Sequence, residues 1–439
     1  MYFDAPASLL QKNRLIEINP NLICLGVTYK SLDGFQPLCI PLEERFRHIA
    51  IFGATGTGKS TMLINMMFQD MINGHGFCFI DPKGDAIYEV ISRIPRDRIK
   101  DLILIDPVNF DRGIKINFFE VPKEISNKET FKELLLSNIV ELMRQQTKFW
   151  GERFGRLFEV IVRIMLDYNE KVNKAEQLTL LDLYRIILKK ENLKEFVKLS
   201  RDFILRSYVE EALQIKGEEQ SREALLRRLN DWLHNKIVRK IISCKTSSFN
   251  FNKAIISKKI ILVRIPQGEI GSCATQLIGS MIVTLLWAAI KSKECTKREP
   301  FFLYVDELHN FIFKKSLFDV ILSEARAFKL GLILASQYPS QLSKGIKRAI
   351  YGNCSTFVAF NIQNPEDAEF AAKRLLVTGS DLVALSPYKA YVRTRCNLKK
   401  KTETHLMLSY PPLPKLWDAD RVMKIAKFSI NLYDELSHN

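Results

Sequence analysis

The chain has 439 residues, 47% of them apolar, so it can bury a full α/β core and a second domain, and it is globular rather than disordered. Lysine and arginine outnumber aspartate and glutamate by 65 to 49, which gives a formal net charge of +16. This excess favours a polyanionic partner such as nucleic acid or an anionic membrane surface, and the alternative is a basic cytosolic protein without such a partner.

The first 47 residues contain short apolar runs separated by Gly26, Gly34, Pro37 and Pro41. This pattern predicts a short β-rich N-terminal lead-in. The opening MYFDAPASLLQKNR lacks the long apolar core of a signal peptide. We therefore expect no leader sequence at this end.

Short β-branched or apolar runs mark the strands predicted after the lead-in. They are HIAIF (48–52), FCFI (77–80), LILI (102–105), IILVRI (260–265), FFLYV (301–305), LILAS (332–336), TFVAF (356–360) and AYVRT (390–394). Most of these runs are continuous rather than alternating, as in central parallel strands covered on both faces. Helical patterns separate them, so the sequence predicts an α/β fold with a doubly wound, mainly parallel sheet.

The long interval from about 124 to 250 contains no convincing strand. Capping boxes at Ser126 to Glu129 and at Thr179 to Asp182 predict helix starts, and amphipathic spacing continues beyond them. We expect an all-α domain inserted into the sheet domain. The predicted boundaries are 1–47 for the lead-in, 48–123 and 251–410 for the two parts of the sheet domain, 124–250 for the all-α insertion, and 411–439 for a C-terminal tail.

The cysteines do not form a metal-binding or redox motif, because none lies in a CxxC pair or at ligand spacing from a histidine. They are Cys24, Cys39, Cys78, Cys244, Cys273, Cys295, Cys354 and Cys396. We expect reduced thiols in a cytosolic protein. The most membrane-like run is LIGSMIVTLLWAAI (277–290), which is shorter than the ~20 residues that span a bilayer. It predicts a buried helix, and we expect a soluble chain without a transmembrane segment.

The stretch GATGTGKS (53–60) matches the GxxxxGKS pattern of a P-loop, between a predicted strand and a predicted helix. Its glycines let backbone N–H groups converge on phosphates. Lys59 would reach the β- and γ-phosphates of ATP, and Ser60 would offer its hydroxyl to Mg²⁺. The alternative is a glycine-rich turn without a ligand. The predicted nucleotide contacts are Gly53, Ala54, Thr55, Gly56, Thr57, Gly58, Lys59, Ser60 and Thr61.

An acidic pair, Asp306 and Glu307, follows the predicted strand in FFLYVDELHNF (301–311). Asp306 would hold the Mg²⁺ shell through water, and Glu307 would polarise the attacking water. Such a pair can alternatively cap a helix, but the P-loop earlier in the chain favours the metal-and-base interpretation. We expect further strands between the P-loop strand and this one, as in NTPases that hydrolyse ATP to drive movement. The sequence contains no guanine-reading NKxD motif.

Three further residues are candidates for the same site. Gln337 ends a predicted strand, where it could act as a sensor of the γ-phosphate, and the alternative is a surface glutamine. Arg326 could be an arginine finger for a neighbouring subunit, and the alternative is a solvated helix arginine. Asp81 in FIDPKGD would lie beside the P-loop if the strand order allows it. The structural alternative there is a turn, with Asp85 capping the next helix.

In this order, GATGTGKST, FIDPKGD, VDELHNF and ASQ resemble the FtsK–HerA superfamily of DNA-pumping ATPases. Within it, the chain most resembles the coupling proteins of type IV secretion and conjugation, over about residues 22 to 400. The resemblance implies a RecA-like P-loop NTPase core with the all-α insertion, in a homo-hexameric ring around DNA. It assigns catalytic or metal-binding roles to Lys59, Ser60, Asp306 and Glu307. It also implies that Gln337 is the sensor and that Arg326 acts in trans.

The sequence departs from the family in two ways. Membrane coupling proteins usually begin with transmembrane helices, and HerA-type resection motors carry a full N-terminal β-barrel; we expect neither here. The resemblance therefore implies a cytoplasmic protein that could lie at the inner face of the membrane, with a relaxase or a secretion-channel protein as partner. A relative that serves phage or mobile-element DNA is the alternative.

A ring motor would hold the DNA backbone with basic pore loops, without reading sequence. The candidates are Lys344, Lys347, Arg348, Arg112 and Lys115. Each could equally belong to a solvated surface. A basic cluster near the C-terminal end is more typical of an exposed run; it contains Arg393, Arg395, Lys399, Lys400 and Lys401.

The leading hypothesis is an ATP-driven DNA translocase, for single- or double-stranded DNA. One alternative is a secretion or pilus ATPase that moves protein. Another is a nucleotide-gated adaptor in which hydrolysis is only a timer. ATPase stimulation by DNA that weakens steeply with salt would separate them.

Overall fold

The computed structural model describes residues 19–30, 34–110, 113–145, 152–214, 218–292, 298–310, 317–395 and 402–436. The chain divides into two compact units. The sheet unit comprises Met1–Leu104, Ile255–Arg264 and Glu299–Ser429. The helical unit comprises Ile105–Ala254, Ile265–Arg298 and Ile430–Asn439.

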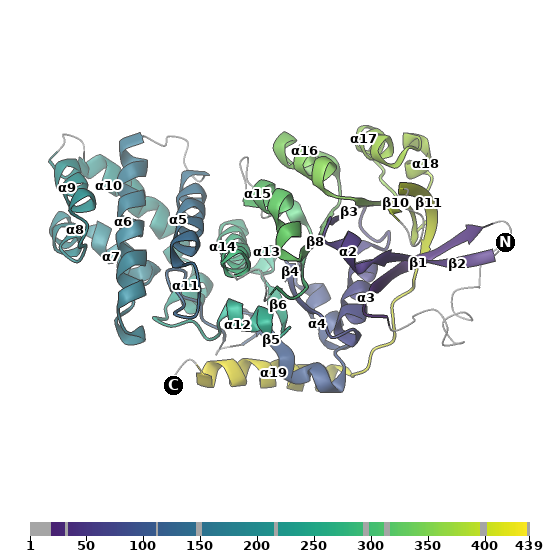
Figure 1. Cartoon of the computed structure of the whole chain (residues 1–439), viewed down its shortest axis with the longest axis horizontal. Helices are drawn as coiled ribbons and strands as arrows, with labels where there is room; N and C mark the ends of the chain where they lie inside the picture. Colours follow the sequence, from purple (N-terminus) through teal and green to yellow (C-terminus); the bar gives the residue numbers. More distant parts are fainter. Residues whose placement is uncertain are drawn as a thin grey trace. The chain divides into compact units, whose positions relative to one another are not determined.

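The described strands form one sheet in the order β2-β1-β11-β10-β9-β3-β8-β7-β4-β6-β5 (Figure 1). Their bounds are β1 (Leu22–Lys30), β2 (Gly34–Pro41), β3 (Ile49–Phe52), β4 (Gly76–Asp81), β5 (Leu102–Ile105), β6 (Ile260–Arg264), β7 (Phe301–Val305), β8 (Leu330–Ser336), β9 (Thr356–Ala359), β10 (Lys389–Arg395) and β11 (Thr402–Ser409). Every strand that the apolar runs predicted is therefore present.

The helices of the sheet unit connect and cover these strands. They are α2 (Leu42–Arg45), α3 (Lys59–Ile72), α4 (Asp85–Ile91), α15 (Leu317–Glu324), α16 (Lys344–Asn353), α17 (Pro365–Leu375) and α18 (Gly379–Val383), with short 3₁₀ helices η1 (Arg96–Asp101), η4 (Leu308–Asn310), η5 (Ala325–Phe328) and η6 (Pro339–Gln341). Figure 1 shows α15 and α16 on one side of the central strands and α3 and α4 on the other. Two helices, α12 (Phe251–Ile256) and α19 (Ala419–Leu436), contain residues of both units.

The central strands run parallel. β3 pairs in parallel with β8 and β9, β7 with β8 and β4, and β4 with β6. All residues of these strands are buried, because helices cover both faces of the sheet. The prediction of a mainly parallel α/β core is confirmed. As expected, a further strand, β8, separates the P-loop strand β3 from the acidic strand β7.

The other end of the sheet is antiparallel. β10 pairs with β9 and β11, and β11 pairs with β1, with Val27 opposite Leu408. β1 and β2 arise from the predicted β-rich lead-in, and they extend the main sheet through β11. The sequence did not predict β11, because TETHLMLS lacks the continuous apolar run that marks the central strands.

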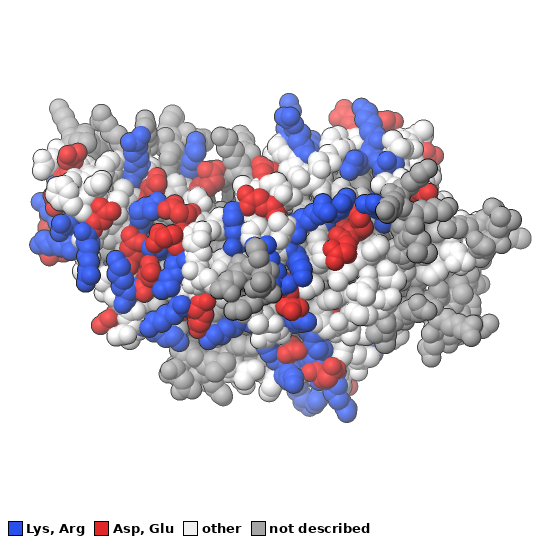
Figure 2. All heavy atoms as spheres, in the orientation of Figure 1, with Lys and Arg blue, Asp and Glu red and all other residues white. Residues whose placement is uncertain are grey.

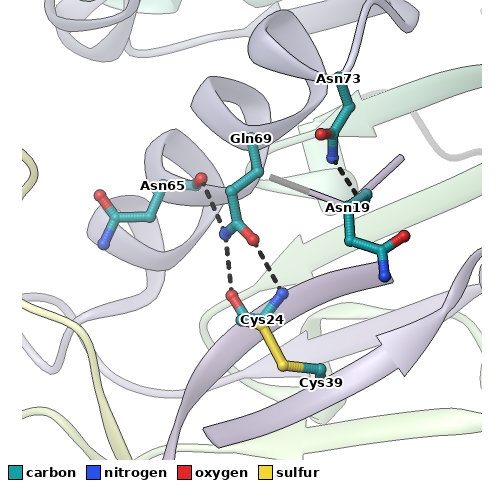
Figure 3. The surroundings of a disulfide bond; sticks show 6 residues. All are labelled: Asn19, Cys24, Cys39, Asn65, Gln69 and Asn73. Carbon is teal, nitrogen blue, oxygen red and sulfur yellow. Dashed lines mark hydrogen bonds between the residues drawn. A yellow bond between two sulfur atoms is a disulfide. The ribbon is translucent and has the colours of Figure 1, made fainter. Parts of the chain in front are cut away.

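The expectation of reduced thiols is wrong for Cys24 and Cys39, which form a disulfide (Figure 3). The two cysteines are 15 residues apart in sequence but lie directly opposite each other in the β1–β2 hairpin. Their separation in sequence gave no signal, because the hairpin register determines which residues face each other. The Gln69 side chain of α3 accepts from the Cys24 N–H and donates to the Cys24 carbonyl, both at 2.8 Å, and so attaches β1 to α3.

A buried ionic cluster joins three elements of the sheet unit. Arg45 of α2 donates two hydrogen bonds to Asp70 of α3, at 2.6 and 2.7 Å. The Tyr304 hydroxyl of β7 donates to Asp70 at 2.5 Å. The Arg45 guanidinium also lies 3.4 Å from the ring centre of Phe302. Arg45 and Asp70 are almost fully buried, so each charge depends on this partner.

In the helical unit, the described residues between 124 and 250 contain helices and no strand, which confirms the predicted all-α insertion. The unit contains α5 (Lys128–Gln145), α6 (Glu152–Lys171), η2 (Lys174–Glu176), α7 (Leu180–Leu188), α8 (Lys190–Val197), α9 (Phe203–Ala212), α10 (Glu218–Leu233), α11 (Lys236–Ile242), α13 (Gln267–Ile270) and α14 (Ser272–Lys291). The capping box at Thr179 and Asp182 is present. The one predicted at Ser126 is wrong by one residue, because the Asn127 side chain accepts from the Thr130 N–H.

The most apolar segment is buried, as predicted. It forms α14, which is longer than the run of apolar residues suggested. Among the described helices, only α14 has the length and composition of a membrane span, and 89% of its most apolar window is buried inside the protein. Asn138 of α5 donates to the Thr284 hydroxyl of α14, and that hydroxyl donates to the Ser280 carbonyl at 2.7 Å. This environment is that of a core helix.

Candidate nucleotide site

The P-loop lies between the end of β3 and the start of α3, as its sequence predicts. Gly53, Gly56 and Gly58 have φ values of 155°, 77° and 117°, in the region that favours glycine. A Cβ on Gly53 would lie 2.6 Å from Cβ of Phe360, so this position also requires the absence of a side chain. The Ala54 N–H donates to the Asn361 carbonyl at 2.8 Å, which attaches the loop to the chain after β9.

Lys59 is buried beneath this loop. Its ammonium group donates to the carbonyls of Gly53 and Ala54, at 2.5 and 3.1 Å. Burial lowers the pKa of Lys59, and the carboxylates of Asp306 and Glu307 offset only part of that effect. The lysine therefore stands where a phosphate bound by the loop N–H groups would meet its charge.

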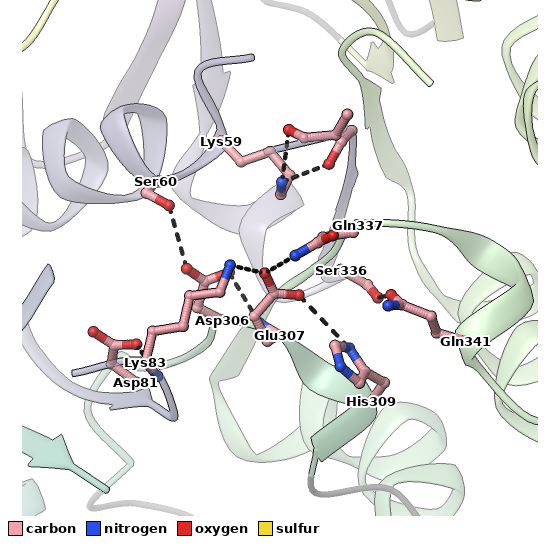
Figure 4. Close-up of polar contacts among 12 residues, drawn as sticks. Lys59, Ser60, Asp81, Lys83, Asp306, Glu307, His309, Ser336, Gln337 and Gln341 are labelled. Atoms are coloured by element: carbon pink, nitrogen blue, oxygen red, sulfur yellow. Dashed lines mark hydrogen bonds and ion pairs between the residues drawn. The ribbon is translucent and has the colours of Figure 1, made fainter. Parts of the chain in front are cut away.

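The structure brings Ser60 and Asp306 together, although 246 positions separate them in the chain. The Ser60 hydroxyl donates to Oδ2 of Asp306 at 3.3 Å (Figure 4). The contact arises because β3, β8 and β7 run parallel, so the segments after them meet at one edge of the sheet. Burial raises the pKa of Asp306, and the neighbouring Glu307 raises it further. A hydroxyl next to a carboxylate is a hard-oxygen donor set that fits Mg²⁺.

Glu307 lies next to Asp306, at a backbone φ of 45° that is rare for glutamate. Its Oε1 accepts from Nε2 of Gln337 at 2.8 Å and from the Lys83 ammonium. Its Oε2 has no hydrogen-bond partner among the described residues and lies 3.6 Å from Nδ1 of His309. Burial alone would raise the pKa of Glu307, but the bonds from Lys83 and Gln337 outweigh it and hold that pKa below its ordinary value. The carboxylate is thus ionised and has one oxygen left to accept a proton.

Asp81 does not lie beside the P-loop strand, because β8 and β7 stand between β3 and β4. It shapes the turn after β4 instead. Its carboxylate accepts from the N–H groups of Lys83 and Ala86, both at 2.9 Å. Asp85 makes no capping bond, and Gly84 occupies the cap position of α4. Burial and the nearby Asp306 raise the pKa of Asp81 to about 6.

Arg326 is not brought to the nucleotide site of its own chain. It is an exposed residue of η5 and lines a pocket of about 430 Å³ with Arg47, His48, Arg374 and Arg393. Arg47 and His48 immediately precede β3, whereas the P-loop follows β3. The pocket therefore lies at the amino end of this strand and the P-loop at its carboxyl end. The role of Arg326 as an arginine finger remains a prediction.

The candidate DNA-binding residues lie on different parts of the fold. Lys344, Lys347 and Arg348 lie on α16, and Figure 2 shows basic side chains projecting from that helix. Lys115 belongs to the helical unit, and Arg112 lies outside the described residues. Over the helical unit, Figure 2 shows acidic and basic side chains interspersed. The ion pairs of this unit include Lys132 with Asp167 at 2.6 Å. The assignment to DNA stays a prediction.

The basic cluster near the C-terminal end is only partly described. Arg395 of β10 lies 3.3 Å from Oε1 of Glu44, and Arg393 lines the Arg326 pocket. Lys399, Lys400 and Lys401 lie outside the described residues.

Sequence reasoning missed two side chains of the site, Lys83 and His309. Both lie within the candidate motifs FIDPKGD and VDELHNF. Lys83 was assigned only to a turn, and nothing in a single sequence says that a turn lysine reaches a carboxylate 224 positions away.

A family model described as the type IV secretion-system coupling protein DNA-binding domain matches residues 35–383. The type 4 coupling protein DotL of Legionella pneumophila is 22% identical over 411 residues, which cover 80% of this chain and 52% of that protein. The chain thus spans about half the length of this curated relative.

Solved structures of the plasmid coupling protein TrwB have the same fold. The unbound monoclinic form has a TM-score of 0.66 at 16% identity and covers 93% of each chain. The complex of TrwB with a non-hydrolysable ATP analogue has a TM-score of 0.65 at 18% identity, covering 87% of this chain and 89% of that one. The complex of TrwB with ADP and Mg²⁺ has a TM-score of 0.63 at 17% identity, covering 86% and 89%.

Proposed function

This chain belongs to the family of type IV secretion-system coupling proteins, because the model of their DNA-binding domain matches residues 35–383. On that premise we propose that it is a Mg²⁺-dependent ATPase that moves DNA. The proposal rests on one observation above all. Lys59, Ser60, Asp306 and Glu307 meet at the carboxyl edge of the parallel strands, although the chain supplies them from two distant stretches. The nucleotide-bound TrwB structures share this fold and support ATP and Mg²⁺ as ligands.

The roles of the residues follow from their positions. The P-loop N–H groups and Lys59 would bind the phosphates, and Thr61 lies in the first turn of α3 below them. Ser60 and Asp306 would hold Mg²⁺, which when bound neutralises charge on the phosphates. Glu307 would take the proton of the attacking water on Oε2, and Gln337 would keep that carboxylate oriented.

In a ring, an adjacent protomer would supply a further positive charge to the nucleotide phosphates. Arg326 lies in a basic pocket at the far end of the P-loop strand, so it could serve the nucleotide of an adjacent protomer and not its own. We assign the chain to a homo-hexamer around DNA, with the basic residues of α16 as candidate pore contacts. A relaxase or a secretion-channel protein is the proposed partner, on the cytoplasmic side of the membrane.

The test is ATPase activity titrated with single-stranded DNA, with duplex DNA and without DNA, each at two salt concentrations. DNA should stimulate turnover, and the stimulation should fall steeply as salt rises, because phosphate contacts release counterions. Lys59→Ala protein is the control for contaminating ATPases. Turnover that is slow and indifferent to both DNAs would contradict translocation and favour an adaptor. If an unfolded protein substrate stimulates ATP turnover and DNA does not, the result would favour a protein-moving ATPase.

A further inference from the structure

We propose that Lys83 is a phosphate-binding residue that holds the Glu307 carboxylate before ATP binds and then transfers to the terminal phosphate of ATP. This inference rests on the proposed ATPase function. It assigns Lys83 two successive partners within one site, where the sequence assigned it only to a turn.

The turn that carries Lys83 is rigidly built. β4 pairs in parallel with β7, and Ile80 lies opposite Val305, so the segments after both strands emerge side by side. Asp81 accepts from the N–H groups of Lys83 and Ala86, which fixes the path of the turn. Gly84 follows at a φ of 86°, and a Cβ there would lie 2.9 Å from Nε of Arg264. The backbone of Lys83 is therefore held at the edge of the site.

The side chain of Lys83 has freedom that its partner lacks. Glu307 is 2% exposed, whereas Lys83 is 47% exposed although its ammonium group contacts Oε1 of Glu307 (Figure 4). The lysine reaches the carboxylate from the solvent side, so it can swing away without disturbing the core. Gln337 donates to the same Oε1 at 2.8 Å, so Glu307 keeps a hydrogen bond after Lys83 has left. The Glu307 carboxylate is therefore not left without a hydrogen-bond donor when Lys83 moves away.

The charges of the site favour the transfer when ATP arrives. Lys83 interacts electrostatically with Glu307, Asp306 and Asp81, and Lys59 lies close enough to repel it. A triphosphate bound by the P-loop brings more negative charge than the single carboxylate that Lys83 pairs with. A diphosphate lacks the terminal group. The structure thus points to a contact that distinguishes ATP from ADP and frees Glu307 at the same step.

The first experiment measures equilibrium binding of Mg²⁺–ADP and of a Mg²⁺-bound non-hydrolysable ATP analogue to the full chain. Lys83→Met, which removes the charge, should weaken analogue binding about tenfold or more and change ADP binding less than about twofold. Lys83→Arg should restore most of the analogue affinity. The matched control is Lys415→Met, because Lys415 also pairs with a glutamate, Glu89, at 2.6 Å. It should change neither affinity.

The second experiment tests the competition between the two partners. Glu307→Gln removes the carboxylate charge, so Lys83 is released and analogue binding should tighten several-fold. The double variant Lys83→Met with Glu307→Gln should lose that gain, while ADP binding stays constant in all variants. A merely structural Lys83 would instead lower ADP and analogue binding equally.

The outcomes separate this inference from the proposed function. Equal loss of both nucleotides in Lys83→Met, or no loss of either, overturns the role of Lys83 while wild-type turnover still supports an ATPase. Failure of the wild-type chain to bind either nucleotide overturns the ATPase assignment itself. Circular dichroism spectra of all variants show whether a loss of binding reflects unfolding.

Discussion

Glu307 is the side chain on which the proposed hydrolysis depends most. It is buried yet ionised, because Lys83 and Gln337 both bond to Oε1 and lower its pKa more than burial raises it. The other oxygen, Oε2, has no partner among the described residues apart from the more distant His309 ring. A base needs an oxygen that can receive a proton, and this geometry leaves one available.

Replacing Glu307 by glutamine should separate binding from turnover. The amide keeps the shape and the bond to Gln337 but cannot accept a proton, so ATP turnover should fall by about 10² to 10⁴. Binding of the ATP analogue should not weaken, and it should tighten several-fold if Lys83 transfers to the terminal phosphate as proposed. Steady-state hydrolysis and equilibrium binding on the same preparation check both parts. Hydrolysis at the wild-type rate would remove Glu307 from the role of base.

His48 makes a prediction about acid stability. Its Nδ1 accepts from the Leu332 N–H and its Nε2 faces the Leu322 carbonyl, both at 3.2 Å, an arrangement that a neutral ring satisfies. Burial lowers the pKa of His48 to about 4 from 6.5. Below pH 6.5 the unfolded chain therefore takes up a proton that the folded chain refuses until about pH 4, and stability falls with pH across this window.

We expect the lowered pKa of His48 to reduce the free energy of unfolding by about 2 kcal/mol between pH 7 and pH 5. His48→Asn should be less stable at pH 7 but should lose correspondingly less on acidification. Asparagine suits the backbone there, because His48 has a φ of 62°. Urea unfolding at both pH values checks the difference. Equal acid losses in the two proteins would contradict the assignment.

Most of the candidate site was predictable at the residue scale. Lys59 and Ser60 lie in a motif whose spacing reflects its mechanism, and Asp306 and Glu307 end an apolar strand. Lys83 and His309 were not predictable, because their roles depend on which strands neighbour each other. The position of Asp81 failed for the same reason. A single sequence reveals strands but not their order.

At the scale of elements, the cluster of Arg45, Asp70 and Tyr304 attaches α2, α3 and β7 to one another. The guanidinium and the carboxylate are both withdrawn from water, and their bidentate pairing offsets the cost. The 14-residue helix α3, which begins at the P-loop lysine, is thus fixed against the strand that leads to Asp306. Its position relative to the acidic pair depends on this cluster.

Asp70→Asn should destabilise the protein by about 3 to 5 kcal/mol, because it leaves the Arg45 charge buried without a counter-ion. Tyr304→Phe removes one hydroxyl and should cost about 1 to 2 kcal/mol. Glu195→Gln is the control, because its pair with Lys198 is exposed on both sides; that change should stay within about 0.5 kcal/mol. Chemical unfolding measures all three, and an unaltered midpoint for Asp70→Asn would refute the role of the cluster.

The elements themselves were predicted to the extent that burial marked them. Strands covered on both faces are continuous apolar runs, so β3, β4 and β7 were readily found. β11 was missed because its residues are largely exposed or half-buried. The Cys24–Cys39 disulfide was missed because pairing across a hairpin depends on register, which no spacing rule supplies.

At the scale of the whole molecule, the position of Arg326 bears on the proposal that the protein works as a ring. Its pocket lies at the amino end of β3, away from the P-loop at the other end. A single chain therefore has no arginine finger from this residue, whereas an adjacent copy could provide one. The ATPase activity per protomer should then rise with protein concentration, because rings assemble as the concentration increases.

Mixing two inactive variants tests this arrangement. Arg326→Ala and Lys59→Ala should each lose ATPase activity by about 10² or more, and an equal mixture should recover up to about a quarter of wild-type activity. Recovery arises because some interfaces then combine an intact Lys59 with a neighbour's intact Arg326. The variants must first be shown to co-assemble by size-exclusion chromatography. Co-assembly without recovery would place Arg326 outside the trans site.

The pairing of β1 with β11 has a consequence for synthesis. β1 leaves the ribosome long before its neighbour on one side, β11 (Thr402–Ser409), is made. Until then, the nascent chain presents a row of unsatisfied backbone donors and acceptors, the kind of template on which chains associate wrongly. Translation stalled before residue 402 should therefore yield aggregation-prone products, and the nascent chain should depend on chaperones while it waits for its closing strand.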